Sequence, residues 1–258
     1  MTGSDGVTPG DMTVNQRFHA AMNFEPVDRL PMVEWASWWD LTLARWHSEG
    51  LSHAVQSRRE LYDHFGLDPY LQAWYKPRRR DCPMPDPPYE GLIEHEADYD
   101  ELMPHLYPEP TLNRPGLEAW TRRQAQGEIV WWFTFDGFFW WPRWLLGVES
   151  HLLAMYDQPG LIHRINSDLA AWQLRWLEAL YDIARPDFMT FAEDMSYNHG
   201  PMVSEQLFDA FMLPYYRRVV PTLQRHGTLA LIDSDGDVSR AVDWFERAGL
   251  DGVLPLER

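Results

Sequence analysis

The fold is decided by one stretch of sequence: DFMTFAED at residues 187–194, SEQLFDAFMLPYYRRVVPTLQRHG at 204–227 and TLALIDSD at 228–235. The first and third segments are short apolar runs that end in carboxylates, and the second has the length of a helix. Such short apolar runs are typical of parallel strands that are covered on both faces. The stretch therefore predicts a strand, a helix and a second strand, with acidic side chains at the carboxyl end of each strand.

The aspartates that end the second strand share one side of it. Side chains alternate along a strand, so Asp233 and Asp235 point to one face and Ser234 to the other. Carboxylates held together raise the pKa of at least one of them unless a cation intervenes. The pair is therefore interpreted as a proton-transfer device, a metal site or an anchor for a substrate. In the alternative interpretation, Asp235 and Asp237 cap the following helix.

The composition excludes several classes of protein. The chain has 258 residues, and its 22 basic and 39 acidic residues give a formal net charge of -17. This charge argues against binding to nucleic acid or to an anionic membrane, because both require a cationic surface. The single cysteine, Cys82, excludes an internal disulfide framework and a cysteine-rich zinc site within the chain. No secretory signal is visible, so we expect a cytoplasmic protein.

One stretch is apolar enough to be compared with a membrane span: IVWWFTFDGFFWWPRWLLGV at 129–148. Asp136, Pro142 and Arg143 interrupt it, and a charge inside a membrane is costly. We therefore expect a buried strand followed by an aromatic loop.

The remaining sequence alternates between strands and helices. We expect strands near residues 30, 70, 130, 190, 230 and 253, most of them followed by a helix. Consecutive units of this kind build a doubly wound sheet or a barrel. A (β/α)8 barrel requires eight strands, and about six are counted here. The chain is therefore expected to be either an open sheet or the front part of a longer barrel.

The domain organisation follows from the same pattern. Residues 1–10 read as a disordered leader, and 11–258 as a single domain with a proline-rich loop insertion at 76–91. The arginines of this insertion, at positions 78 to 80, are interpreted as a solvated patch or as a contact for an anionic substrate. Helices are expected from Thr13, at 52–65 and 113–127, in two pieces between 147 and 184, and after Asp237.

Three segments resemble the uroporphyrinogen decarboxylase family. They are QRFHAAMNFEPVDRLPM at 16–32, AEDMSYNHGPMVSEQLFDAFMLPYYRRVVPTLQRHG at 192–227 and LIDSDGDVSRAVDWFERAGLDGVLPLE at 231–257. The resemblance implies a (β/α)8 barrel of which about six βα units are present and the C-terminal units are missing. It also implies a site at the carboxyl ends of the strands, where the carboxylates fall by the argument from spacing.

The family resemblance implies two activities, and the sequence departs from both. Where the decarboxylases carry an arginine-rich RQAGRY loop that grips a tetrapyrrole, this chain has WASWWD at 35–40. Where the methylcobamide:coenzyme M methyltransferase branch carries an HxC zinc motif, it has Asp233, Ser234 and Asp235. We therefore expect a divergent enzyme that performs metal- or carboxylate-assisted, corrinoid-linked methyl transfer on a small substrate. Uroporphyrinogen decarboxylation in porphyrin biosynthesis and a non-catalytic ligand-binding barrel are the alternatives.

The expected site combines acids from several strand ends with loop residues. The expected catalytic residues are Glu193, Asp233, Asp235 and His199. The expected substrate-binding residues are Glu34, Trp35, Asp136, Tyr197 and Glu257. A divalent metal, zinc or another, would be held by Glu193 and Asp233. The expected partners are a small-molecule substrate and a corrinoid protein, and a homodimer stays open.

Overall fold

The computed structural model describes residues 12–85 and 90–256. The chain divides into two compact units, Met1–Leu71 with Glu118–Trp131 and Gln72–Leu117 with Trp132–Arg258, and each is described as far as these residues extend. The expected leader at 1–10 and the expected site residue Glu257 lie outside the described residues.

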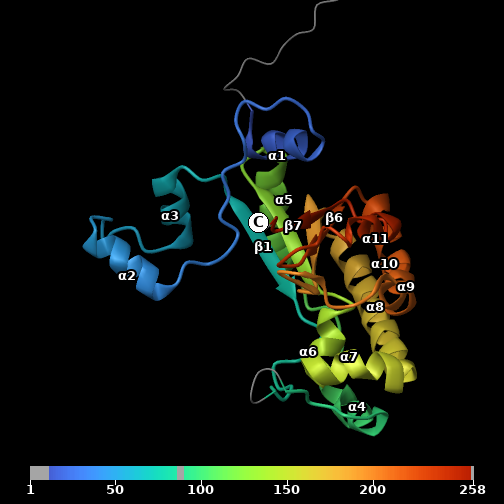
Figure 1. The fold of residues 1–258 in the computed structure, drawn as a ribbon. Helices are drawn as coiled ribbons and strands as arrows, with labels where there is room; N and C mark the ends of the chain where they lie inside the picture. The colour runs from blue at the N-terminus through green and yellow to red at the C-terminus, as the bar shows by residue number, and fades with distance from the viewer. Residues whose placement is uncertain (1–11, 86–89, 257–258) are drawn as a thin grey trace, which may run out of the picture. The chain divides into compact units, whose positions relative to one another are not determined.

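A five-stranded sheet runs through the described residues in the order β1, β2, β3, β6, β7 (Figure 1). The pairs β2–β3, β3–β6 and β6–β7 are parallel. The strands are β1 Tyr70–Tyr75, β2 Val130–Asp136, β3 Phe188–Ala192, β6 Leu229–Asp233 and β7 Gly252–Leu254. Their spatial order follows their order along the chain, so the described sheet lacks the switch point of a doubly wound fold. The expected α/β class is confirmed, and closure into a barrel is not seen among the described residues.

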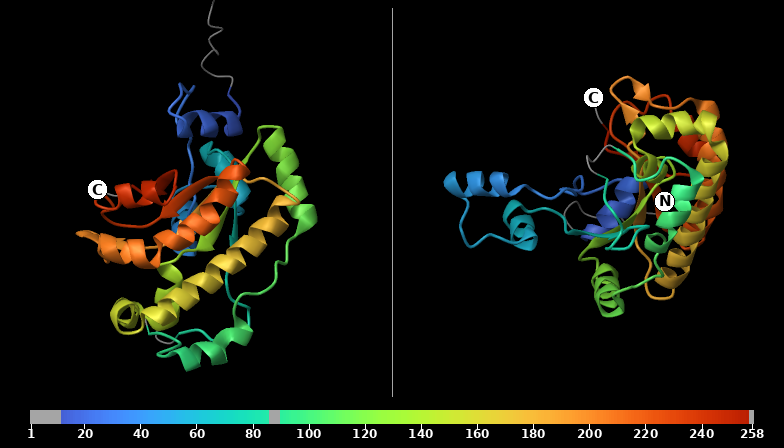
Figure 2. Two further views of the ribbon diagram at one scale, coloured as in Figure 1. Left: turned by 90° about the vertical axis from the view of Figure 1, so that its right-hand side faces the viewer. Right: turned by 90° about the horizontal axis from the view of Figure 1, so that it is seen from below.

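Two long helices cover one face of this sheet. Helices α8 (Pro159–Tyr181) and α10 (Leu213–Arg225) run along it (Figures 1 and 2). The Phe135 side chain of β2 faces α8, with its ring 5.3 Å from that of Trp172. The apolar stripe predicted for core packing on α8 is buried, which confirms that prediction: Leu169, Trp172, Trp176, Leu177 and Leu180.

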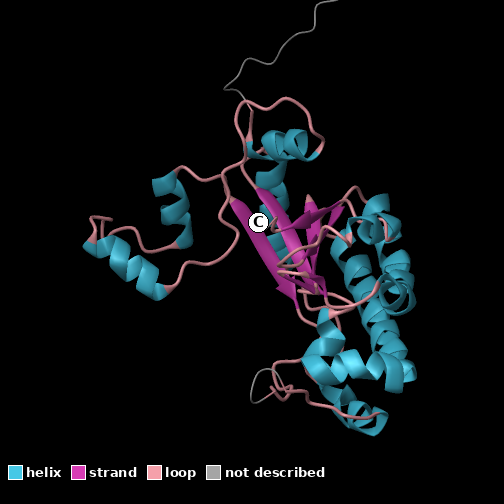
Figure 3. Cartoon of the chain, viewed as in Figure 1, coloured by secondary structure: helices cyan, strands magenta, loops and turns pink. Residues whose placement is uncertain are grey.

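Shorter elements follow the strand ends (Figure 3). The helices are α4 Glu96–Leu102, the 3-10 helix η1 Met103–His105, α6 Trp140–Leu146, α7 Val148–Asp157, α9 Glu205–Phe211 and α11 Val242–Arg247. Strands β4 (Ser196–Tyr197) and β5 (Gly200–Pro201) form a separate antiparallel hairpin after β3. Among the described helices, none combines the length and the apolar character needed to cross a bilayer.

The strand expected near residue 30 does not form. Leu30 and Met32 are 75% and 44% exposed. Instead of a ladder, Met32 of this segment makes two hydrogen bonds with Asp68. Asp68 N donates to Met32 O at 2.7 Å, and Met32 N donates to the Asp68 side-chain oxygen Oδ2 at 2.8 Å. Pro31 has no N–H to continue a ladder, which favours an irregular connection over a strand.

The helix expected at 204–227 is two helices, because the chain breaks between α9 and α10 at Met212. Pro214 lies in the first turn of α10, where its missing N–H costs nothing but prevents continuation from α9. The aromatic loop expected after β2 contains α6. Asp237 caps a turn rather than the next helix, since its Oδ1 accepts from Ser239 N at 2.9 Å and α11 begins later.

The first unit contains α1 (Val14–Met22), α2 (Asp40–Ser48), α3 (Arg58–Phe65) and most of α5 (Arg114–Ala125). Thr13 caps α1 as expected, in a reciprocal pair of hydrogen bonds with Gln16. Helix α2 was not expected, and α3 is shorter than the helix expected at 52–65, because Ser57 caps its N-terminus.

A buried ion-pair network explains the PVDR sequence in the first unit. Asp68, 3% exposed, accepts from Arg17 Nη1 at 3.0 Å and from Arg29 Nη2 at 2.7 Å. Arg17 also donates through Nε and Nη2 to the two oxygens of Asp28, each at 2.7 Å. This arrangement holds the pKa of Asp28 down at about 2. The motif therefore ties α1 to the segment before β1.

Removing Asp68 should unfold this unit more easily. Asp68→Ala leaves the buried Arg17 guanidinium with one carboxylate fewer, and loss of a buried ionic partner costs about 3–5 kcal/mol. The control is Asp63→Ala, because Asp63 is exposed and makes only a 4.0 Å surface pair with Arg59, so its change should stay within about 0.5 kcal/mol. Urea denaturation of both variants measures the difference, and equal effects would contradict the structural role of the network.

Candidate active site

The carboxyl ends of the central strands place two acidic side chains in one row. Asp136 ends β2, Ala192 ends β3 and Asp233 ends β6, and these three residues are neighbours in the register of the sheet. Residues in register on adjacent parallel strands project to the same face, so Asp136 and Asp233 share a face. Two strand spacings, or about 10 Å, separate them. Ala192, which lies between the two aspartates in the register of the sheet, has only a methyl side chain.

This face is the one turned away from α8. The Phe135 ring contacts α8, so the neighbouring side chains of Thr134 and Asp136 point to the opposite face. There the hydroxyl oxygens of Thr134 and Thr190 lie 2.7 Å apart, and Gln72 Nε2 donates to Thr134 Oγ1 at 2.8 Å. Hydrogen-bonded polar groups therefore line this face next to the two aspartates.

Asp233 lies among other carboxylates. Its burial and the charges of Asp194 and Asp235 raise its pKa to about 7. Asp194, which has a left-handed φ of 40°, follows β3, and its backbone N–H donates to Asp233 O at 3.3 Å. Burial and the charge of Asp235 also raise the pKa of Asp194, while Arg143 acts in the opposite direction. A carboxyl group that titrates near neutral pH suits proton transfer.

Asp136 is paired with the one lysine of the chain. Lys76 Nζ lies 2.8 Å from Asp136 Oδ1, and Trp74 Nε1 donates to the same oxygen at 3.3 Å. Burial raises the pKa of Asp136 and lowers that of Lys76, and their mutual attraction opposes both shifts. The sequence pattern predicted a site role for Asp136 but not for Lys76, although a single lysine directly after an expected strand was a usable signal.

Glu193 is fully buried and accepts four hydrogen bonds. Its Oε1 accepts from Phe138 N at 2.6 Å and from the Tyr216 hydroxyl, while its Oε2 accepts from Phe139 N at 2.7 Å and Trp140 N at 2.9 Å. Burial raises its pKa to about 7, although these donors favour the charged form. A carboxylate offers about four lone-pair directions, and all four are occupied. The arrangement argues against Glu193 as a catalytic acid or a metal ligand.

The hairpin β4–β5 carries the two loop residues that were expected in the site. The Tyr197 and His199 rings pack edge to face at 5.7 Å, both side chains are exposed, and Asp237 N donates to Tyr197 O at 2.9 Å. The hairpin is thus fastened to the loop that follows β6. Among the described residues, no hydrogen bond joins His199 to Asp233 or Glu193, so the expected partnership with these acids is not seen.

Glu34 and Trp35 belong to the first unit, where their backbone is held against α3. The Tyr62 hydroxyl donates to Glu34 O, and Arg58 Nη2 donates to the carbonyl oxygens of Glu34 and Trp35, each at 3.1 Å. The Glu34 carboxylate accepts from Ala36 N at 3.1 Å. Both residues therefore have structural contacts within their own unit.

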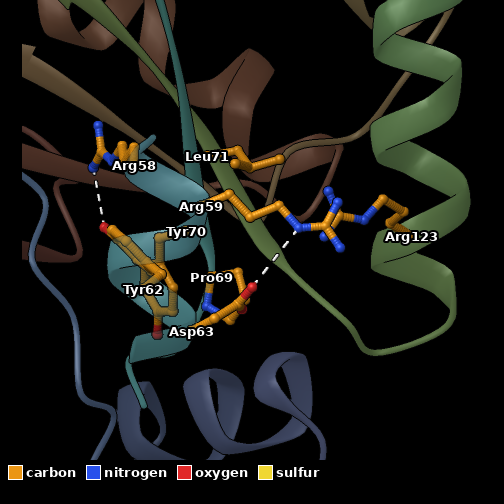
Figure 4. A pocket seen from close by; sticks show the side chains of 8 residues that line it. All are labelled: Arg58, Arg59, Tyr62, Asp63, Pro69, Tyr70, Leu71 and Arg123. Carbon is orange, nitrogen blue, oxygen red and sulfur yellow. Dashed lines mark hydrogen bonds and ion pairs between the residues drawn. The ribbon is translucent and has the colours of Figure 1, made fainter. Parts of the chain in front are cut away.

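The first unit also contains a small pocket of about 180 Å³ (Figure 4). Its three arginines already have partners. Arg58 donates to the Tyr62 hydroxyl at 3.0 Å, Arg59 lies 4.0 Å from Asp63, and Arg123 Nε donates to Glu128 Oε2 at 3.1 Å. The pocket is lined by Arg58, Arg59, Tyr62, Asp63, Pro69, Tyr70, Leu71 and Arg123. None of the residues expected in the site lines it.

The described residues offer no ready-made metal site. Among them, no three histidine, cysteine, aspartate or glutamate side chains are arranged to hold one ion. Of the expected ligands Glu193 and Asp233, Glu193 has no lone pair left for a metal, because hydrogen-bond donors of the protein occupy all of them. The residues present therefore do not fit the expected metal.

Comparison with known proteins shows the fold. Neither a protein-family model nor the sequence of a curated protein matches the chain. Among solved structures, a methyltransferase from Methanosarcina mazei is similar, with a TM-score of 0.58 and 14% sequence identity over 94% of this chain and 76% of that chain. The chain therefore has a methyltransferase-like α/β fold, and membership of the uroporphyrinogen decarboxylase family is not confirmed.

The hydrogen bonds of Glu193 require a glycine at position 137. A Cβ atom at Gly137 would lie 2.1 Å from Glu193 Cδ and Oε1. Gly137→Ala should therefore destabilise the chain by about 3 kcal/mol, because neither the buried carboxylate nor its backbone donors can move away cheaply. The control is Gly160→Ala in the first turn of α8, which meets no atom within 4 Å and should be neutral or slightly stabilising. Thermal unfolding compares them, and equal melting temperatures would contradict this assignment.

Asp233 should make the stability of the chain fall as the pH rises. Its pKa of about 7 in the folded state lies above the ordinary 3.8, so folding favours the protonated form. The stabilising contribution is fully present below about pH 4 and lost as the pH rises through about 7. Asp233→Asn should therefore exceed the parent in stability at about pH 8, by about 2 kcal/mol after allowance for its partial exposure.

Denaturant titrations at about pH 5 and about pH 8 measure this difference. Asp243→Asn is the matched control, because Asp243 is an exposed aspartate in the first turn of α11. A pH dependence that is the same in Asp233→Asn and in the parent chain would overturn the protonation behaviour assigned to Asp233.

Proposed function

We propose that this chain is a divergent member of the uroporphyrinogen decarboxylase family that transfers a methyl group between a corrinoid-bound form and a small substrate. The observation that carries the proposal is Asp233, a strand-end carboxyl with a pKa of about 7, between the charges of Asp194 and Asp235 on a methyltransferase-like fold. Such a group can accept a proton from a substrate nucleophile at neutral pH.

The proposal includes a (β/α)8 barrel. Two features of the sheet support it: the strand order follows the chain order, and α8, which runs beside α10 (Figure 2), packs on the face opposite to Thr134 and Asp136. A doubly wound sheet would carry helices on both faces and a reversal of strand order. In a barrel, the Thr134 face lines the interior and the carboxyl ends of the strands surround the site.

In the proposed reaction, the residues of this chain manage the proton and the position of the substrate. The corrinoid, carried by a partner protein, would supply an electrophilic methyl group and would keep the electron pair of the broken cobalt–carbon bond. Asp233 accepts the proton that the substrate nucleophile loses when its new bond to the methyl carbon forms. Burial and the charges of Asp194 and Asp235 keep that carboxylate basic enough to act near neutral pH. Glu193 positions the loop after β2 and does not exchange protons with the substrate.

Methyl transfer from free methylcobalamin to a panel of small thiols, amines and hydroxy compounds tests the proposal. The 258-residue chain should consume methylcobalamin in the presence of at least one acceptor, as followed by the visible absorbance of the corrinoid. Asp233→Asn should lower the rate by about 100-fold, the usual contribution of a general base, whereas Asp243→Asn should retain it.

Two results would overturn the proposal. Release of carbon dioxide from uroporphyrinogen without methyl transfer would show a decarboxylase. Saturable binding of small molecules with no turnover of either kind would show a ligand-binding barrel.

A further inference from the structure

Lys76, which directly follows β1, has an N–H donor that is available to a ligand. Its ammonium contacts Asp136 Oδ1 at 2.8 Å and lies 3.6 Å from the centre of the Trp74 ring. An ammonium group has three N–H donors, so these two contacts leave a third donor unused by them. The Lys76 side chain is 35% exposed, which makes that donor accessible to a ligand.

Arg78 lies two residues beyond Lys76 in the chain and adds a second positive charge near it. Its guanidinium lies 5.2 Å from the centre of the Trp144 ring, and its backbone forms an isolated bridge with Leu106. Arg78 is close enough to Lys76 for the two positive charges to repel each other, and its charge also acts on Asp136. Among the described residues, no carboxylate forms an ion pair with Arg78, whereas Lys76 is paired with Asp136.

We propose that Lys76 and Arg78 form a binding subsite for an anionic group, a carboxylate or a phosphate, on a small ligand. Lys76 and Arg78 carry two positive charges and Asp136 one negative charge, so a bound anion would compensate the positive charge that remains. The guanidinium offers a planar pair of donors and the ammonium a point charge, a combination suited to either oxyanion. The exposed Trp74 indole adds an apolar surface beside the anion.

The position of this subsite indicates where the ligand carries its anionic group. Lys76 is joined to Asp136, and Asp233 lies two strands further along the same row, about 10 Å away. If the proposed methyl transfer holds, on which this reading of the ligand as substrate rests, the substrate carries its anion at the β1 end and its reacting group at the β6 end. The binding of the anion itself does not depend on that reaction.

A simpler interpretation is that Lys76 serves only to neutralise the buried Asp136. That interpretation accounts for the 2.8 Å ion pair, but it gives Arg78 no role and predicts no response of Lys76 to added anions. The two interpretations therefore differ in a measurement on Lys76 itself.

Lys76 is the one lysine of the chain, so carbon-13-labelled lysine gives a single side-chain Cε signal in NMR spectra. We expect sodium acetate or sodium phosphate, added at constant ionic strength with sodium chloride, to shift this signal saturably. Arg78→Gln should weaken that binding by about tenfold, the loss of one charge-assisted contact. Arg79→Gln is the matched control, because Arg79 pairs with Asp81 on the surface and should leave the affinity unchanged.

Each outcome of this titration is informative. A response to phosphate alone assigns the ligand to the phosphate class, and a response to acetate alone assigns it to the carboxylates. No saturable shift with either anion, or equal weakening by Arg78→Gln and Arg79→Gln, overturns the subsite. Asp233→Asn should still bind the anion, so failure of the methyl-transfer assay and failure of the subsite are distinguished.

Discussion

The structure of the second unit depends on the buried carboxylate of Glu193. It accepts from three consecutive backbone N–H groups and from the Tyr216 hydroxyl, and so joins the end of β3 to the loop after β2 and to α10. These donors belong to a loop end and the start of a helix, where backbone N–H groups otherwise lack partners. A carboxylate with 0% exposure is tolerated there because it satisfies several of them at once.

The fixed loop in turn orients the acids that remain accessible. Arg143 of α6 donates to the backbone oxygen of Asp194, and the backbone of Asp194 contacts Asp233. The acids at the strand ends therefore differ in the groups that surround their carboxylates. Glu193 has hydrogen-bond donors and Asp136 has Lys76, whereas burial and the charges of Asp194 and Asp235 raise the pKa of Asp233. Environment, rather than residue type, separates a positioning carboxylate from one that can exchange protons.

The likeness to a methyltransferase of 14% identity shows how little sequence the fold requires. Buried apolar strands, amphipathic helices on one face and polar strand ends are enough to specify it, and many different sequences satisfy those demands. The chemistry resides in a few side chains at one edge of the sheet, and these vary independently of the fold.

The sequence by itself determined the features that depend on neighbours along the chain. Strand alternation located β3 and β6 and their terminal acids, and local capping located α1, because both rest on contacts within a few residues. Tertiary structure alone decided the rest. Lys76 meets Asp136 across 60 positions, and Glu193 meets its backbone donors across more than 50, so no local pattern reveals either. Whether a carboxylate is saturated or free depends on such distant donors, and therefore only the folded chain distinguishes Glu193 from Asp233.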